Sequence, residues 1–365
     1  MAQGNRTTLL PDGGEFFATL IDEINRTTTL LLLEFYIIRS DRAGLLFAKA
    51  LTAAVRRGVR VLLSYDYIGS FDTSSDYFLK LKQAGVCCRA FNPPAFRRTI
   101  HLLDQRDHRK LALFDGVRAM VGGSNIGDEY SGHGSGRKWR DAGVMIEGPA
   151  VAELGVLFRE TWQHDGAPFP EQGLLPESSS REGDDTVGII GGSPRHPRSA
   201  IRRSFQLAIA GASESVGVMT PYFLPGPRLV RSLLKAVRRG VRVRLVLPAV
   251  SDVPLVRLLS RGYYHPLLTN GIEIFERQQE MLHAKVMLID GQWSIFGSAN
   301  LDHRSFKRNY EVGVIIESRE FGGQVAEMID RDLEHSRRIT LDEHRRRGWL
   351  LRLMEVAFSP IARFL

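Results

Sequence analysis

The feature that most constrains the fold of this chain is an eight-residue segment that occurs twice. Ala-Val-Arg-Arg-Gly-Val-Arg-Val fills residues 54–61 and again residues 236–243. In both places it closes an amphipathic helix (Leu45–Arg57 and Leu229–Arg239), turns at its glycine and enters an apolar strand. Glycine is the residue expected where a helix ends in a left-handed turn. Self-similarity over a helix, a turn and a strand indicates that a structural unit has been duplicated.

Two further pairs of segments repeat in the same order. Ala84-Gly85-Val86 and Asn270-Gly271-Ile272 each end a helix and begin a short strand. Apolar strands precede the repeated octapeptide at Leu30–Ile38 and Ser215–Leu224. The order strand, helix, strand, helix, strand is typical of a layered α/β domain. We therefore expect two duplicated α/β/α layered domains in a pseudo-twofold arrangement, with one active site at their interface.

The chain has 365 residues, which is enough for two separate cores. Residues 165–199 are rich in Pro, Gly, Ser and charge and show little periodicity, which predicts a linker or a long surface loop. The expected N-terminal domain spans 1–164, the C-terminal domain spans 200–340, and a basic and apolar tail spans 341–365. Each expected domain then holds one copy of the repeated unit.

Each copy also contains the same pattern of polar residues. A histidine is followed by a lysine two positions later, by an aspartate after four more residues, and by a glycine-rich segment that ends in asparagine. An apolar run after each lysine predicts a buried strand, and the period of two puts the histidine and the lysine on one face. The residues of the pattern are His108, Lys110, Asp115 and Asn125 in the first copy and His283, Lys285, Asp290 and Asn300 in the second.

This pattern suits chemistry at a phosphoryl group. An imidazole titrates near neutrality, so one histidine can attack phosphorus while the other protonates the leaving oxygen. Lysine charges and asparagine amides stabilise the non-bridging oxygens as these gain charge. Lysines beside the histidines oppose a cation and no ligand set accompanies them, so we expect neither a metal nor another cofactor. A single His-x-Lys is usually a satisfied core histidine beside a surface lysine, but its repetition in a duplicated scaffold favours a catalytic site.

The pattern resembles the two signature motifs of the phospholipase D superfamily, and the resemblance covers nearly the whole chain. The flanking segments are similar to those of bacterial cardiolipin synthases of the type without N-terminal transmembrane helices. These segments are Trp139-Arg140-Asp141, Thr220-Pro221-Tyr222-Phe223 and Asn300-Leu301-Asp302-His303-Arg304-Ser305.

The resemblance implies roles for individual residues. His108 would be the nucleophile that forms a phosphatidyl-histidine intermediate, and His283 the acid that protonates the departing alcohol and then activates the incoming one. Asp141 and Glu311 lie where the family places a carboxylate that bonds the far nitrogen of each histidine, although both also fit ordinary strand-end carboxylates. The expected phosphate-binding residues are Lys110, Lys285, Asn125, Asn300 and Ser298.

Two positions of the motifs carry a qualification. Asp115 and Asp290 belong to the motif as candidate catalytic residues, but both begin turns, and Asx-turn chemistry explains them without catalysis. Gly123 stands where the family pattern has a serine, which the second copy keeps as Ser298. We expect this loss of a hydroxyl to alter activity or substrate preference.

Charge and composition bear on the partner and the location. Lys and Arg outnumber Asp and Glu by 49 to 41, which favours anionic partners. Adjacent Cys87 and Cys88 are not expected to form a disulfide and fit a reducing compartment. Met1 to Asp12 shows no secretory signal, and no early apolar run is long enough to span a bilayer. We expect a peripheral protein on the cytoplasmic face of a bacterial membrane, without a transmembrane helix.

The tail supports contact with lipid. Arg345-Arg346-Arg347 precedes a segment from Trp349 to Leu365 with a broad apolar face, which suits an anionic membrane surface. A helix docked on the protein's own core is the alternative, and Pro360 argues against one straight helix. The basic segment Phe96-Arg97-Arg98 fits either lipid headgroups or an ordinary exposed loop.

The sequence thus predicts a phosphatidyltransferase that moves a phosphatidyl group from phosphatidylglycerol to a second phospholipid alcohol. One alternative is a phospholipase D or nuclease that transfers the same intermediate to water. The tail and the absence of a basic stripe with interleaved aromatics favour lipid, so we expect no nucleic-acid partner. The other alternative is a non-catalytic membrane-surface scaffold, against which the intact residues of both copies argue.

Overall fold

The computed structural model describes residues 1–94, 104–133, 138–170, 180–195 and 199–363. The predicted basic segment 96–98 lies outside these residues, as do parts of the expected linker. The N-terminal half has strands β1 (Ala2–Leu10), β2 (Leu30–Phe35), β3 (Arg60–Asp66), β4 (Cys87–Phe91), β5 (Arg106–Asp107), β6 (Leu111–Phe114), β7 (Arg118–Gly122), β8 (Trp139–Arg140) and β9 (Gly143–Glu147). Its helices are α1 (Gly13–Arg26), α2 (Arg42–Arg56), α3 (Ser75–Gln83), α5 (Asp128–Ser131) and α6 (Val151–Trp162).

The C-terminal half has strands β10 (Asp185–Gly192), β11 (Ser215–Met219), β12 (Arg242–Pro248), β13 (Glu273–Arg277), β14 (Met281–Leu282), β15 (Val286–Ile289), β16 (Trp293–Gly297), β17 (Asn309–Glu317) and β18 (Ser336–Ile339). Its helices are α7 (Ala200–Gly211), α8 (Gly226–Arg238), α9 (Pro254–Gly262), α10 (Tyr264–Thr269), α11 (His303–Lys307), α12 (Arg319–Glu334), α13 (Leu341–Arg345) and α14 (Trp349–Phe358), followed by a 3₁₀ turn at Ser359–Arg363.

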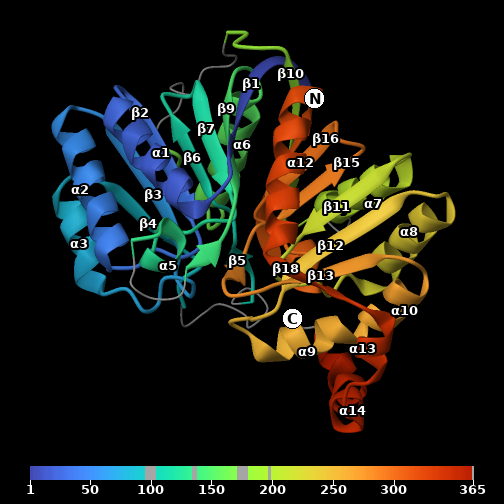
Figure 1. The fold of residues 1–365 in the computed structure, drawn as a ribbon. Coiled ribbons are helices and arrows are strands. Elements are labelled where there is room, and N and C mark those ends of the chain that lie inside the picture. Colours follow the sequence, from blue (N-terminus) through green and yellow to red (C-terminus); the bar gives the residue numbers. More distant parts are fainter. Residues whose placement is uncertain (95–103, 134–137, 171–179, 196–198, 364–365) are drawn as a thin grey trace.

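The two halves have the same sheet topology. The strand order is β4-β3-β2-β6-β7-β9-β1 in one half and β13-β12-β11-β15-β16-β17-β10 in the other, with β18 added beside β13. β1 and β10 pair with each other antiparallel, so the two sheets continue into one another at the centre of the molecule (Figure 1). The predicted fold class of two duplicated α/β layered domains is confirmed.

The apolar run of β2 illustrates why the layers form. Its leucines alternate between two cores: Leu31 and Leu33 pack under the outer helices of the N-terminal half, and Leu30 and Leu32 face the central core. The central core contains α6 and α12 and strands from both halves. A strand that is covered on both faces needs apolar residues at every position. The sequence pattern therefore indicates a sheet that is covered by helices on both faces.

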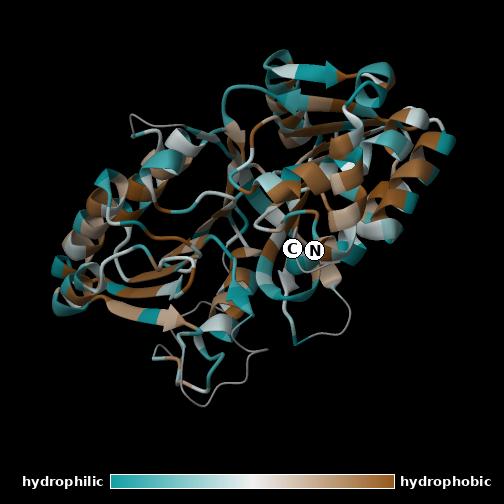
Figure 2. Cartoon of the chain, turned by 90° about the horizontal axis from the view of Figure 1, so that it is seen from below, coloured by the Kyte–Doolittle hydropathy of each residue, from teal (hydrophilic) through white to brown (hydrophobic). Residues whose placement is uncertain are grey.

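The helices follow the amphipathic pattern of the sequence. In α8 the buried residues Leu229, Leu233 and Ala236 recur at helical spacing, and the helices in Figure 2 carry both hydrophobic and hydrophilic segments. The repeated octapeptide ends α2 and α8 at Gly58 and Gly240, which both have φ of 92°. The left-handed turns predicted from the two glycines are present.

The expected linker is partly ordered as sheet. Residues 185–192 form β10, which pairs with β1 on one side and with β17 on the other. The loop-like composition of this segment led us to expect a linker or surface loop. A strand that is paired on both edges is held by backbone hydrogen bonds, so it forms even where its residues have a low propensity for strands. This strand is the C-terminal counterpart of β1, so it belongs to the second repeat.

The tail does not bury its apolar face. Among its side chains Trp349 is 74% exposed, Leu353 is 55% exposed and Val356 is 71% exposed, while Glu355 is the buried residue of α14. α14 ends at Phe358, shortly before Pro360, and projects from the body beside α13 (Figure 1). The alternative of an apolar helix docked on the core is wrong for this face. Within the described part of the chain, no helix combines the length and the apolar character needed to cross a bilayer.

Candidate active site

The two halves bring both histidines to one cavity. His108 and His283 line a cavity of about 390 Å³ together with Asn125 and Asn300. Each histidine stands just ahead of a buried strand, β6 or β15, so its backbone is fixed while its side chain reaches the interface. Four residues predicted from the sequence thus meet in a single site between the domains.

Short strands that cross between the halves place the histidines. β5 pairs in parallel with the start of β17, and β14 pairs in parallel with β8. The His108 amide donates to the Tyr310 carbonyl at 2.9 Å, and the His283 amide donates to the Arg140 carbonyl at 2.7 Å. Each histidine backbone is therefore hydrogen-bonded to the opposite half of the protein.

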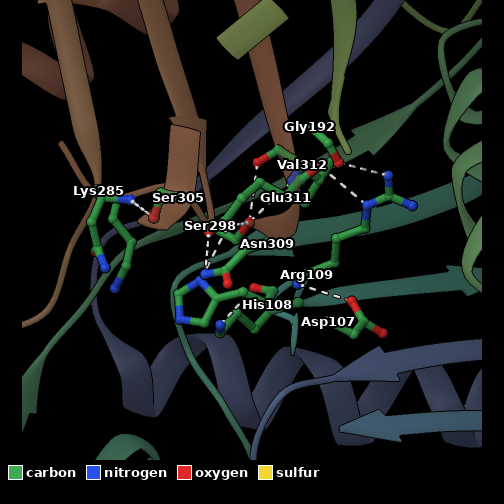
Figure 3. Close-up of polar contacts among 12 residues, drawn as sticks. Asp107, His108, Arg109, Gly192, Lys285, Ser298, Ser305, Asn309, Glu311 and Val312 are labelled. Atoms are coloured by element: carbon green, nitrogen blue, oxygen red, sulfur yellow. Dashed lines mark hydrogen bonds and ion pairs between the residues drawn. The ribbon is translucent and has the colours of Figure 1, made fainter. Parts of the chain in front are cut away.

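The same crossing pairs each histidine with a carboxylate of the opposite half. Glu311 Oε2 lies 3.1 Å from His108 Nδ1, and Asp141 Oδ2 lies 2.6 Å from His283 Nδ1 (the His108 pair is shown in Figure 3). Both carboxylates are fully buried. When Nδ1 donates its proton to the carboxylate, Nε2 carries the lone pair. These contacts exclude the interpretation of Asp141 and Glu311 as ordinary strand-end carboxylates.

The two lysines lie behind the histidines and do not line the cavity. Lys110 Nζ donates to the His108 carbonyl at 2.6 Å and lies 5.2 Å from the centre of the Tyr36 ring. Lys285 Nζ donates to the His283 carbonyl and lies 2.9 Å from His283 Nδ1. Burial lowers the pKa of Lys110 to about 7 and that of Lys285 to about 8. Their positive charge therefore acts on the site from behind the histidines.

The histidines are neutral in the free site. Burial is the main cause that lowers the pKa of His108 and of His283 to about 4, and the nearby lysines lower both further. Two cationic lysines and two carboxylates balance one another. A bound phosphodiester adds one negative charge to this balance, which favours protonation of an imidazole.

Asn125 is oriented by the backbone of the loop after β2. Its Oδ1 accepts a hydrogen bond from the Ile37 amide at 3.0 Å. Asn300 is positioned by a hydrogen bond that its backbone amide donates to Ser305 Oγ at 3.1 Å. Both asparagines reach the cavity wall from opposite halves, as the repeated motif implies.

Ser298 and Gly123 occupy equivalent positions with different contacts. The Ser298 hydroxyl donates to Glu311 and accepts from the Val312 amide at 3.0 Å, so it lies beside the carboxylate instead of on the cavity wall (Figure 3). At Gly123, an added Cβ would lie 2.3 Å from Asp141 Oδ1. Ser298 therefore positions Glu311 in this structure, and a phosphate contact for Ser298 stays a prediction.

Asp115 and Asp290 lie away from the cavity. They follow β6 and β15, at the ends of those strands opposite the histidines. Asp115 accepts hydrogen bonds from the amides of Thr28, Thr29 and Leu30. The Asp290 carboxylate accepts from the three amides of residues 213–215. Both aspartates hold the start of a neighbouring strand through these hydrogen bonds and neither lines the cavity, which favours a structural role over the catalytic one.

Aromatic and basic residues of the cavity escaped the sequence reasoning. Tyr36 packs against the His108 ring with 5.0 Å between centroids, and Tyr130 packs against the His283 ring at 5.4 Å. Arg106 lines the cavity and forms a buried ion pair with Asp66 at 3.3 Å. Arg106 precedes His108 by two positions, and this spacing was the available signal. The tyrosines lie in no motif, so only the fold reveals them.

Comparison with known proteins gives one consistent family. The family model for the cardiolipin synthase, phospholipase D-like domain matches residues 20–162 and 207–333. The chain is 32% identical to a cardiolipin synthase of Geobacillus kaustophilus over 355 residues, which cover 96% of this chain and 70% of that protein. It is 33% identical to cardiolipin synthase A of Pseudomonas putida over 361 residues, which cover 98% of this chain and 75% of that protein.

Solved structures share the fold at low sequence identity. Phosphatidylserine synthase of Haemophilus influenzae superposes with a TM-score of 0.75 and 13% identity, covering 98% of this chain and 93% of that chain. Polyphosphate kinase of Porphyromonas gingivalis superposes with a TM-score of 0.60 and 13% identity, covering 90% of this chain and 50% of that chain.

Proposed function

The chain belongs to the cardiolipin synthase family of phospholipase D-like phosphatidyltransferases, and we propose that it joins two phospholipids through one phosphohistidine intermediate. The donor is phosphatidylglycerol, whose phosphatidyl group passes to a hydroxyl of a second phospholipid. When the acceptor is also phosphatidylglycerol, the products are cardiolipin and glycerol. The observation that carries this proposal is the pair of histidines that line one cavity, each bonded to a carboxylate of the opposite half.

In the first step His108 is the nucleophile. Its neutral Nε2 attacks phosphorus, an N–P bond forms, and the bond from phosphorus to the glycerol oxygen breaks. The bound phosphodiester favours the imidazolium form of His283, and the proton on its Nε2 then passes to that oxygen, so glycerol leaves as a neutral alcohol. His108 can act in this way because Glu311 holds its Nδ1 and burial keeps the ring neutral.

In the second step His283 is the base. It takes the proton of the acceptor hydroxyl, the acceptor oxygen attacks phosphorus, and the N–P bond to His108 breaks. His283 ends the cycle protonated, in the form that the bound phosphodiester favours. The short contact with Asp141 stabilises the imidazolium at this position.

Charge development on the phosphoryl oxygens is stabilised from two sides. Asn125 and Asn300 supply amide donors at the cavity wall, and Lys110 and Lys285 supply positive charge from behind. In a buried site these fixed charges act through a low dielectric, so they contribute more than they would in water.

The exposed apolar face of α14 supports attachment to a bacterial membrane, and the expected side is the cytoplasmic face. Exposed aromatic and aliphatic side chains beside the exposed Arg345 and Arg346 match the chemistry of an anionic lipid surface. A phosphatidyltransferase must reach lipids that stay in their bilayer, so the helix would keep the cavity near its substrate.

The experiment uses purified protein and vesicles of phosphatidylglycerol. We expect release of glycerol and formation of cardiolipin, measured by mass spectrometry, and loss of both in His108→Ala and His283→Ala variants. Phosphatidic acid as the sole product would instead identify a hydrolase, and turnover of single-stranded DNA but not lipid would identify a nuclease. Unchanged turnover in both histidine variants would overturn the proposed site.

Metal independence is tested in the same assay. We expect activity to persist in EDTA, because two lysines and two asparagines already supply the charge stabilisation. Complete loss in EDTA with recovery on adding a divalent cation would contradict the mechanism.

A further inference from the structure

A second cavity of about 350 Å³ lies next to the catalytic cavity. Leu224 lines both, and so forms part of the wall between them. His303 lines the second cavity, while its chain neighbours Asp302 and Arg304 line the first. The two cavities are thus adjacent, and the mechanism above uses only one of them.

Three basic residues line the second cavity: Arg202 of α7, Arg228 of α8 and His303 of α11. None of the described residues that line it is acidic. No ion pair joins Arg202 or Arg228 to a carboxylate within the described part of the chain. By contrast, Arg304 on the catalytic side is paired with Asp104 at 3.1 Å. The second cavity therefore carries an uncompensated positive charge.

The pKa of His303 supports the same conclusion. Burial lowers it, and the neighbouring cations Arg308, Lys307 and Arg202 lower it further. Arg308 is paired with Asp104, whereas Lys307 is exposed and Arg202 is half-buried. The groups that face His303 are thus dominated by positive charge, and an anion bound among them would relieve this repulsion.

Apart from the three basic residues, the lining of the cavity is largely apolar. Leu224, Phe306 and Tyr263 contribute to it, and Ala362 adds a contact from the 3₁₀ turn that follows α14. A free inorganic anion would gain nothing from these apolar residues. A ligand that joins an anionic group to apolar chains matches both the basic and the apolar part of this lining, and the exposed apolar face of α14 lies on the same segment of the tail.

We propose that the second cavity binds the phosphodiester of the acceptor phospholipid. This inference rests on the proposed function, in which a second phospholipid must present its alcohol to the phosphohistidine. The three-carbon glycerol headgroup separates that attacking hydroxyl from the acceptor's own phosphate. The acceptor phosphate must therefore lie outside the catalytic cavity but beside it, and Arg202 and Arg228 are the groups that would bind it.

The test compares two acceptors in the Arg202→Gln/Arg228→Gln variant. With labelled free glycerol as the acceptor, the enzyme exchanges label into phosphatidylglycerol without needing a second phosphate site. We expect this exchange to stay near the wild-type rate, whereas cardiolipin formation falls by about tenfold or more as charge-assisted contacts are lost. The matched control is Arg203→Gln/Arg231→Gln, which removes the same charge from the same two helices at positions that do not line the cavity.

Every outcome separates the acceptor site from the proposed function. If wild-type protein makes neither cardiolipin nor labelled phosphatidylglycerol, the proposed function fails. If it makes both and the two double variants behave alike, the function stands and the acceptor site is overturned. If Arg202→Gln/Arg228→Gln loses both reactions equally, the cavity serves the donor or the fold, and the acceptor assignment is again overturned.

Discussion

Gly123 and Asp141 occupy one small space beside His283: a β-carbon on Gly123 would lie 2.3 Å from Asp141 Oδ1. The equivalent space beside His108 holds the Ser298 hydroxyl hydrogen-bonded to Glu311. The shorter carboxylate is thus found with the smaller neighbour and the longer carboxylate with the larger one. The lack of a side chain at position 123 therefore leaves the space that Asp141 occupies when it contacts His283.

Substitution at Gly123 tests this relationship. We expect Gly123→Ser to displace Asp141 and lower kcat by about 100-fold, the loss typical of a misplacement of one ångström at a reacting group. Thermal unfolding and phosphatidyl-transfer assays measure the effect. Gly323→Ser is the control, because a β-carbon at that position meets no atom within 4 Å. Full activity in Gly123→Ser would show that Asp141 tolerates a serine there.

The two carboxylates that bond the histidines, Asp141 and Glu311, should affect different steps of the reaction. We expect Asp141→Asn and Glu311→Gln each to lower turnover of phosphatidylglycerol by as much as about 10⁴-fold, as for the carboxylate of a Ser-His-Asp triad. A diester with a p-nitrophenyl leaving group needs no acid. With that substrate Asp141→Asn should still release a burst of p-nitrophenol, and Glu311→Gln should not. The reverse pattern would exchange the roles of His108 and His283.

The buried lysines predict an alkaline limit to activity. Their pKa values, about 7 for Lys110 and about 8 for Lys285, lie below that of a solvated lysine, so their charge is lost as the pH rises through this range. Loss of this charge weakens phosphate binding, and kcat/KM should therefore fall above about pH 7. A profile that stays flat up to pH 10 would mean that both lysines remain charged.

Asp115 should act on stability and not on chemistry. We expect Asp115→Ala to lower the free energy of unfolding by about 2 kcal/mol, since a charged acceptor of several backbone amides is removed. These bonds hold the pKa of Asp115 below its usual value, so this contribution is present at neutral pH and is lost as the pH falls through the pKa of the folded state. Denaturant unfolding and the transfer assay, with exposed Asp22→Ala as the control, separate the two effects. A large loss of kcat at full stability would restore a catalytic role.

The tail should matter only when the substrate is in a membrane. We expect Leu353→Ser/Val356→Ser to reduce cosedimentation with anionic vesicles and to leave hydrolysis of a soluble diester unchanged. The control Leu207→Ser changes an apolar side chain that is 61% exposed on α7. Equal vesicle binding by both variants would remove α14 from the membrane contact.

The layered fold and the histidines and asparagines of the site could be predicted from patterns along the chain. Duplication was visible because an octapeptide and a polar motif recur in one order, and the leucine run of β2 required cover on both faces. The histidines and asparagines of the two motifs were identified for the same reason. These features are local in sequence, so periodicity and spacing suffice to predict them.

Which histidine contacts which carboxylate could not be predicted from the sequence, because the contacts form between the two halves. Glu311 bonds His108 and Asp141 bonds His283 because short strands pair across the two halves. The spacing of residues within one repeat contains no information about a partner in the other repeat. Strand β10 was not predicted, because it is stabilised by pairing with strands on both edges and not by the strand propensity of its own residues. Gly123 appeared to be a missing hydroxyl in the sequence, and only the packing of Asp141 against it gives the physical reason for its presence.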